Sequence, residues 1–122
     1  NKRNAAYYEP TVLTAVVPGM PAFDDELFGP VAAVVKVKDR KESVVMAINS
    51  KFGLGSMLFT EDIKSARKII GDIPDGAFFI NEMVKSDPRL PFGGTKASGF
   101  GRELSMEGIL EFVNKKTVYI RK

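Results

Sequence analysis

Residues 24–30 combine acidic, aromatic and turn-forming side chains in the order Asp-Asp-Glu-Leu-Phe-Gly-Pro. The carboxylate of Glu26 offers two acceptor oxygens, which suit the paired hydroxyls of a vicinal diol, and Phe28 could pack on a ring of the same ligand. By spacing alone, the simpler interpretation is a solvated acidic turn, because carboxylates usually lie in water and Gly-Pro pairs mark turns. The segment is therefore a candidate ligand site with a plain structural alternative.

Residues 91–103 form a second candidate, which holds four glycines and an Arg-Glu pair. Glycine permits close backbone approach but raises the entropy cost of ordering, so a ligand or tightly packed protein must justify the loop. The segment lacks the lysine of a P-loop and the third glycine of a dinucleotide fingerprint. We therefore expect a structural crossover loop, with Arg102 and Glu103 as an ordinary structural pair. The cations Arg89 and Lys96 could bind an anionic substrate, although single exposed cations usually have no specific role.

Composition excludes several kinds of chemistry. The chain has 122 residues, neither cysteine nor histidine, and a net charge of +3 with interspersed signs. It therefore has no thiolate nucleophile, no imidazole base and no soft metal site, and independent catalysis is not expected. The absence of disulfides fits a reducing compartment, so we expect the cytoplasm. No basic stripe favours nucleic acid, and no apolar run approaches the roughly 20 residues of a membrane span.

Hydrophobic patterning predicts alternating strands and helices, an α/β architecture with parallel strands. The apolar run 31–37 is typical of a strand buried on both faces. Helices are expected after Asp39, which with Glu42 resembles a capping box, and after Thr60 or Asp62. The other expected elements are strands at 56–60, 77–80 and 117–120 and a helix over 104–113. So few strands make a narrow sheet with long edges, and such edges usually pair with something else.

Two glycine-punctuated segments together resemble one family. Residues 23–31 are similar to the E-E-I-F-G-P-V segment of aldehyde dehydrogenases, and residues 91–103 resemble their P-F-G-G-x-K-x-S-G-x-G-R-E segment. Their spacing fits as well, and so do Phe52–Gly55, Phe59-Thr60 and Lys116–Tyr119. Ser86–Gly94 looks most like the branch that includes bacterial and archaeal succinate-semialdehyde dehydrogenases. The resemblance covers essentially the whole chain.

The resemblance implies that this chain matches only the C-terminal part of the family's polypeptide. Residues 1–115 would be the later half of the catalytic domain, and residues 116–122 an oligomerisation strand that joins a partner subunit's sheet. The nucleotide-binding domain, the nucleophilic cysteine, the glutamate base and the oxyanion-stabilising asparagine would lie upstream. Because this chain contains no cysteine, the resemblance implies no catalytic residue and no metal site within it.

The resemblance also assigns roles to individual residues. Glu26 matches the glutamate that holds the nicotinamide ribose hydroxyls, and Phe28 matches the aromatic beside the nicotinamide ring. Phe92 falls where the family lines its substrate tunnel, and Val84 and Ser86 fall on the variable loop that tunes substrate choice. The implied cofactor is NAD or NADP, bound by the complete enzyme, and the implied substrate is a small aldehyde, with succinate semialdehyde as the candidate.

Three functions remain open at this point. The leading one is a fragment of an NAD(P)-dependent aldehyde dehydrogenase that is inactive alone. The second is a non-catalytic assembly module that forms a homo-oligomer, a dimer or larger, through its terminal strand and exposed edges. The third is an independent small-ligand binder that uses Glu26 and Phe28. This function is disfavoured because so little of a concave pocket is present.

Overall fold

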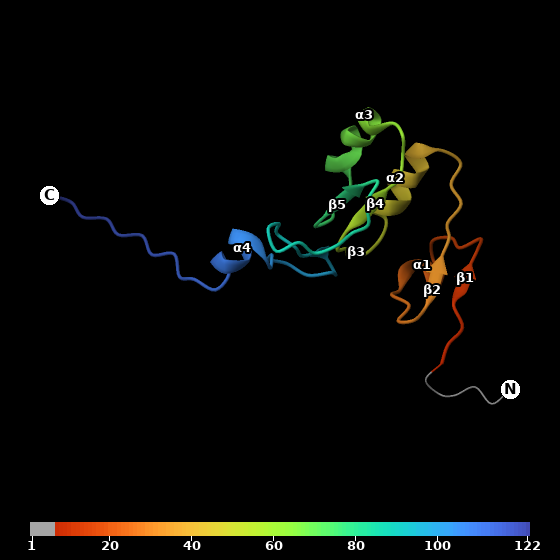
Figure 1. The fold of residues 1–122 in the computed structure, drawn as a ribbon, viewed down its shortest axis with the longest axis horizontal. Helices are drawn as coiled ribbons and strands as arrows, with labels where there is room; N and C mark the ends of the chain where they lie inside the picture. Colours follow the sequence, from red (N-terminus) through yellow and green to blue (C-terminus); the bar gives the residue numbers. More distant parts are fainter. Residues whose placement is uncertain (1–6) are drawn as a thin grey trace. The chain divides into compact units, whose positions relative to one another are not determined.

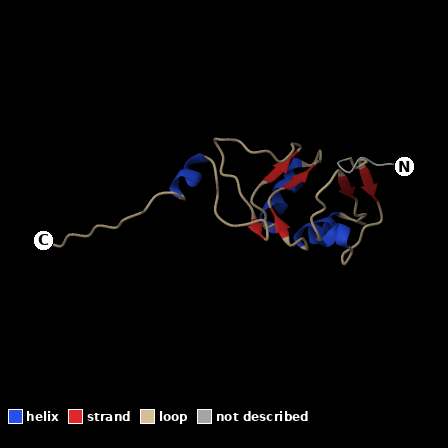
Figure 2. Ribbon diagram, turned by 90° about the horizontal axis from the view of Figure 1, so that it is seen from below, coloured by secondary structure: helices blue, strands red, loops and turns tan. Residues whose placement is uncertain are grey.

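The computed structural model describes residues 7–122, which divide into two compact units. The first unit ends at Ser50 and the second runs from Lys51 to Lys122 (Figure 1). Both units mix short helices and short strands with long connecting loops (Figure 2). The predicted α/β class with parallel strands is confirmed.

The first unit is built on two parallel strands, β1 (Thr11–Leu13) and β2 (Val31–Ala33), paired with Thr11 opposite Val31. The one-turn helix α1 (Pro21–Asp24) lies on the connection between them and begins with proline, whose fixed φ suits the first helical position. The predicted strand 31–37 is shorter than expected. Its residues Ala32 to Val34 are exposed, because no second layer covers them within the described residues.

Helix α2 (Arg40–Ile48) begins at the predicted capping residue. The Asp39 carboxylate accepts a hydrogen bond from the backbone N–H of Glu42 at 2.9 Å. The return bond differs from a standard capping box, because the Glu42 carboxylate accepts from the N–H of Lys38 at 2.6 Å instead of from Asp39. The first of these bonds satisfies the N–H of Glu42, one of the backbone donors that a helix start leaves unpaired.

In the second unit, β4 (Ser56–Leu58) and β5 (Phe78–Ile80) run parallel and are joined through α3 (Ile63–Ala66) and the 3₁₀ helix η1 (Arg67–Asp72). Asp62, not Thr60, caps α3, since its carboxylate accepts from the N–H of Ser65 at 2.9 Å. The hydroxyl of Thr60 accepts from the N–H of Asp62 instead, at 3.1 Å.

The glycine-rich loop is tied into this unit by a short antiparallel pair, β3 (Phe52–Gly53) with β6 (Thr95–Lys96). Helix α4 (Ser105–Leu110) follows and is shorter than the predicted 104–113. The expected narrow sheet of three or four strands is replaced by three separate two-stranded pairs.

The predicted strand at 117–120 is not formed. Residues 114–122 have no regular secondary structure, and Val118, Tyr119 and Ile120 are exposed by 70%, 84% and 80%. A strand needs a neighbour for its backbone N–H and C=O groups, and none of the described residues pairs with this segment. Its pairing with a partner subunit stays a prediction.

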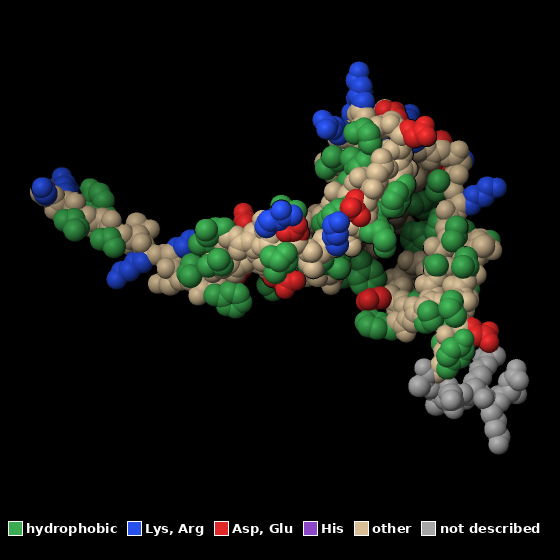
Figure 3. Space-filling model, in the orientation of Figure 1, with side chains coloured by type: hydrophobic (Ala, Val, Ile, Leu, Met, Phe, Trp, Pro, Cys, Tyr) green, Lys and Arg blue, Asp and Glu red, His purple; other side chains and the backbone are tan. Residues whose placement is uncertain are grey.

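The described chain has almost no core of its own. Val16 in the first unit and Ala66 in the second are its only buried hydrophobic residues, and apolar side chains cover much of the visible face (Figure 3). Exposed apolar side chains include Phe28, Phe100 and Phe112, at 94%, 100% and 91%. Apolar surface of this kind is typical of interaction sites, and association of this chain through it stays a prediction. Among residues 7–122, no helix is both long and apolar enough to cross a membrane.

Candidate functional site

The loop that carries Glu26 and Phe28 leaves α1 and enters β2 through two successive tight turns. The Leu27 carbonyl accepts from the N–H of Gly29, and the Gly29 carbonyl accepts from the N–H of Val31, each at 2.8 Å. Such three-residue turns are common at the ends of strands. The Pro30 carbonyl then accepts from the N–H of Thr11 at 2.9 Å, so the loop is fixed to the β1–β2 pair.

Both candidate side chains on this loop point to solvent and are available to a ligand. Phe28 is 94% exposed and lies at a hollow of about 560 Å³ whose lining is mostly apolar and aromatic. Glu26 is exposed and forms no hydrogen bond or ion pair with any residue from 7 to 122. A free carboxylate two residues from a free ring is an arrangement that can accept hydroxyl donors and stack on a flat ring.

The glycine-rich loop, in contrast, is held by its own backbone. Phe92 and Glu103 exchange two backbone hydrogen bonds of 2.9 and 2.8 Å across the base of the loop. Inside the loop, one guanidinium nitrogen of Arg102 donates to the carbonyls of Gly94, at 3.1 Å, and Gly101, at 2.6 Å. Arg102 therefore binds the loop and does not pair with Glu103 as we expected.

Two glycines are required here by close backbone approach. A Cβ on Gly76 would lie 1.6 Å from the carbonyl oxygen of Gly93, and one on Gly94 would lie 2.5 Å from Ser98 Cβ. Ser98 also accepts a hydrogen bond from the N–H of Gly53 through its hydroxyl, at 3.0 Å. These contacts support the interpretation of this segment as a structural loop, which stays a prediction.

The three candidate tunnel residues lie in the second unit but are not gathered in one pocket. Phe92 lines a hollow of about 400 Å³ beside the glycine-rich loop, together with Leu54 and Phe112. Val84 packs over Gly55, where an added Cβ would lie 2.9 Å from Val84 Cγ1. Ser86 is exposed and forms no hydrogen bond with any described residue. Neither Val84 nor Ser86 lines the hollow at Phe92.

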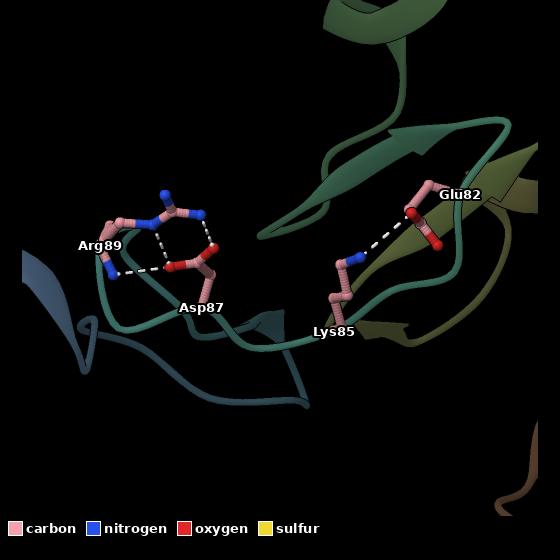
Figure 4. Close-up of polar contacts among 4 residues, drawn as sticks. All are labelled: Glu82, Lys85, Asp87 and Arg89. Atoms are coloured by element: carbon pink, nitrogen blue, oxygen red, sulfur yellow. Dashed lines mark hydrogen bonds and ion pairs between the residues drawn. The ribbon is translucent and has the colours of Figure 1, made fainter.

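Charged side chains on the same loop form two local pairs (Figure 4). The Arg89 guanidinium donates from Nε to Asp87 Oδ1 at 2.9 Å and from Nη2 to Oδ2 at 2.6 Å, and Lys85 pairs with Glu82 at 3.1 Å. The two side-chain bonds from Arg89, together with a bond from its backbone N–H, hold the pKa of the Asp87 carboxyl well below its ordinary value. The side-chain bonds and the charge of Asp87 in turn raise the pKa of Arg89. The pKa of Glu82 is lowered mainly by the backbone N–H of Met83, which donates to its carboxylate, and further by the hydrogen bond and charge of Lys85.

The pairing of Arg89 with Asp87 was not predicted, so the expectation that Arg89 has no specific role is wrong. The signal was the Asp-Pro-Arg-Leu order, since Asp at the first position and Pro at the second are typical of a type I turn. The Leu90 N–H does donate to the Asp87 carbonyl at 2.9 Å, which closes that turn and brings Arg89 back over Asp87.

We expect the Asp87 carboxyl to titrate below its ordinary pKa of 3.8 and to return toward it in Arg89→Gln. Because folding depresses this pKa, the stabilisation it reflects is fully present above about pH 4 and is lost as the pH falls through the lowered value. Carbon-detected NMR titration of the carboxyl in the two proteins tests this. Since the pair is exposed, 1 M salt should narrow the difference in the Asp87 pKa between the wild type and Arg89→Gln. Equal titration curves for the two proteins would contradict the pairing.

Within residues 7–122, no group of three or more Asp, Glu, His or Cys side chains could hold a metal ion. The groups left for chemistry are the Glu26 carboxylate and the Phe28 ring on one loop and the apolar hollow at Phe92 beside the other. Comparison with known proteins then identifies the class, because the aldehyde dehydrogenase family matches residues 1–118 and this chain belongs to it.

Two curated relatives that it resembles carry the same activity in their names. The chain is 53% identical over 114 residues to a probable NADP⁺ succinate-semialdehyde dehydrogenase from Synechocystis, covering 93% of this chain and 25% of that protein. It is 49% identical to the NADP⁺ succinate-semialdehyde dehydrogenase of Deinococcus radiodurans, covering 93% and 24%. The predicted likeness to this branch is confirmed.

A solved structure shows the same backbone. The succinic semialdehyde dehydrogenase of Streptococcus pyogenes, crystallised with NADP⁺, matches with a TM-score of 0.88 and 38% identity, covering 95% of this chain and 26% of that one. The chain thus spans about a quarter of the length of the relatives it matches.

Proposed function

We propose that this chain functions as part of an NAD(P)-dependent aldehyde dehydrogenase that oxidises succinate semialdehyde to the dicarboxylic acid. The observation that carries the proposal is its identity, 53% and 49%, to two proteins named for that activity, over 93% of its length. The chain would supply a cofactor-facing loop and part of a substrate tunnel. The nucleophile and the nucleotide-binding domain would come from the rest of the enzyme.

Glu26 and Phe28 fit the nicotinamide end of the cofactor. The carboxylate of Glu26 is free to accept both ribose hydroxyls, and the exposed ring of Phe28 is free to pack against the nicotinamide. When bound, the cofactor accepts the hydride that leaves the aldehyde carbon. The task of this chain is to hold the acceptor ring at a fixed distance, because hydride transfer depends steeply on the geometry of the reacting atoms.

Val84, Ser86 and Phe92 are proposed to face the aldehyde. Phe92 presents an apolar wall whose position is fixed by its two backbone bonds to Glu103. Ser86 brings a hydroxyl with no partner among the described residues, and Val84 is held against Gly55. An apolar wall and an available hydroxyl can orient a small substrate, and because Ser86 does not line the hollow at Phe92, the aldehyde would have to reach both in the complete enzyme.

The chain alone should not oxidise aldehydes, since it has no cysteine to attack the carbonyl. The test is to express the complete polypeptide that contains this segment, and this segment alone, and to follow reduction of NADP⁺ with succinate semialdehyde at 340 nm. The complete polypeptide should be active, and the segment should not. A complete polypeptide that binds NADP⁺ but leaves the aldehyde unchanged would rule out the proposed activity.

In the complete enzyme, we expect Glu26→Gln to slow hydride transfer more than acyl hydrolysis, by roughly 10- to 100-fold, because the amide holds the ribose hydroxyls less well. Stopped-flow measurement of the first turnover, compared with the steady-state rate, separates the two steps. The matched control is Asp24→Asn, an exposed carboxylate on the adjoining helix α1. An unchanged first turnover in Glu26→Gln would remove this role from Glu26.

A second role, in assembly, is favoured by the exposed apolar surface and by the unpaired segment 114–122. We expect the chain to associate with itself or with a full-length relative, as a dimer or larger, through this tail and its strand edges. Sedimentation velocity across a hundredfold range of concentration tests this. Deletion of residues 116–122 should weaken association, and a monomer at every concentration would contradict it.

A further inference from the structure

We propose that Asp87 is a positioning residue for the substrate loop, acting through Arg89 to fix the turn that separates Ser86 from Phe92. The inference rests on the proposed function, in which Ser86 and Phe92 face the aldehyde. In this proposal Asp87 contacts neither the substrate nor the cofactor, and its role is to fix the positions of Ser86 and Phe92.

The first support is the number of bonds that meet at one carboxylate. Asp87 accepts from the backbone N–H of Arg89 at 2.9 Å, from its Nε at 2.9 Å and from its Nη2 at 2.6 Å. The two side-chain bonds form a bidentate fork, which fixes orientation as well as distance. The Asp87 side chain is only 24% exposed, whereas that of Arg89 is 86% exposed, so Arg89 folds back over Asp87 from the solvent side.

The second support is that the turn is hydrogen-bonded to the start of the next helix. The Pro88 carbonyl accepts from the N–H of Ser105 at 3.1 Å, which joins the turn to the start of α4. Phe92, two residues beyond Leu90, is held to Glu103 by its two backbone bonds. A distortion of the turn would therefore displace groups on both of its sides, because little slack is left in the chain.

The third support is that Ser86 has no anchor of its own. It precedes Asp87 directly and forms no hydrogen bond with any described residue. Its position is set by the residue that follows, and Asp87 is the most highly bonded side chain of the loop in Figure 4. A hydroxyl that must be in place before substrate arrives gains from such a rigid neighbour, because ordering it at binding would lower affinity.

The Glu82–Lys85 pair on the same loop is a matched control. It joins two side chains by a single bond of 3.1 Å, and both are more than half exposed, at 54% and 61%. Exposed single-contact pairs contribute little to structure. Lys85→Gln removes a charge and a pair, as Arg89→Gln does, without touching the turn.

The experiment compares Asp87→Asn, Arg89→Gln, the double variant and Lys85→Gln in the complete enzyme. In Asp87→Asn and Arg89→Gln, we expect the KM for succinate semialdehyde to rise about tenfold, while kcat and the KM for NADP⁺ change less than about threefold. The double variant should be no worse than either single one, since both remove the same fork. Lys85→Gln should match the wild type.

A second readout is independent of activity. Amide hydrogen exchange at Arg89 and Leu90 should speed up at least about tenfold in Asp87→Asn, while the Thr60 amide, held by Asn81 at 2.7 Å, stays unchanged. An unaltered aldehyde KM in folded Asp87→Asn, or additive effects in the double variant, would overturn the inference and leave the proposed function intact. An inactive wild type would reject the proposed function, whereas faster exchange would still establish the fork's hold on the turn.

Discussion

Gly76→Ala is expected to destabilise the second unit by about 4 kcal/mol or more, because its added Cβ would approach another atom more closely than at any other glycine described. The added Cβ would lie 1.6 Å from the carbonyl oxygen of Gly93 and 2.8 Å from its carbonyl carbon. Both are backbone atoms, so no side chain can rotate away to make room. The turn before β5 and the glycine-rich loop would have to separate, which would also break the bond from Gly76 N–H to Gly53 O at 3.0 Å.

Urea denaturation at one fixed protein concentration measures this effect, because association would make the midpoint depend on concentration. The control is Gly71→Ala, in the 3₁₀ helix η1, where nothing lies within 4 Å of the added Cβ and φ is not positive. That change should be neutral or stabilise by up to about 1 kcal/mol. If both variants unfolded at the wild-type midpoint, the close approach of the two loops would be wrong.

The parts of the fold that local chemistry determines were predictable. The Asp39 carboxylate can reach the N–H three residues on, so the start of α2 follows from the sequence itself. The apolar strands at 56–60 and 77–80 were placed correctly to within two residues. Close packing was predicted for the glycines of residues 91–103, and Gly93 and Gly94 do have it, whereas Gly99 and Gly101 adopt positive φ without a close neighbour.

Features that depend on distant partners were not predictable. The run 31–37 looks like a buried strand, yet its residues are largely exposed, since what buries a strand is the layer above it and not its own composition. The segment 117–120 has strand-forming side chains but no neighbour among the described residues. The Asp87–Arg89 fork was local and was missed because the turn signal at Pro88 was not combined with the charges beside it.

The site residues also divide into those that local contacts explain and those that depend on a partner outside the described residues. Family resemblance brought Glu26, Phe28, Val84, Ser86 and Phe92 forward, and the structure shows two of them as free polar groups and one as a nearly fully exposed ring. Their roles stay predictions, because a carboxylate or hydroxyl acquires a role only from the group that meets it. Arg102 shows the converse, since its partners are backbone carbonyls of its own loop and geometry alone explains it.

Arg102→Met is expected to destabilise the second unit by about 3 kcal/mol. The Arg102 stem packs against Gly93, since its Cδ lies 3.2 Å from where a Cβ on Gly93 would stand. Methionine keeps an apolar stem in this place. It removes the donor shared by the carbonyls of Gly94 and Gly101, and Gly94 is buried. Leaving part-buried acceptors without a donor costs about 1–3 kcal/mol each, so the loop loses more than one ordinary hydrogen bond.

The same urea titration measures the effect, with two further variants to interpret it. Arg102→Lys keeps the charge and one set of donors without the planar fork, so it should recover only part of the loss. Arg67→Met, at an exposed position in η1, should change stability by no more than about 0.5 kcal/mol. If Arg102→Met and Arg67→Met gave equal midpoints, the loop would owe its shape to glycine packing and the Phe92–Glu103 bonds alone, and the guanidinium would be free for another task.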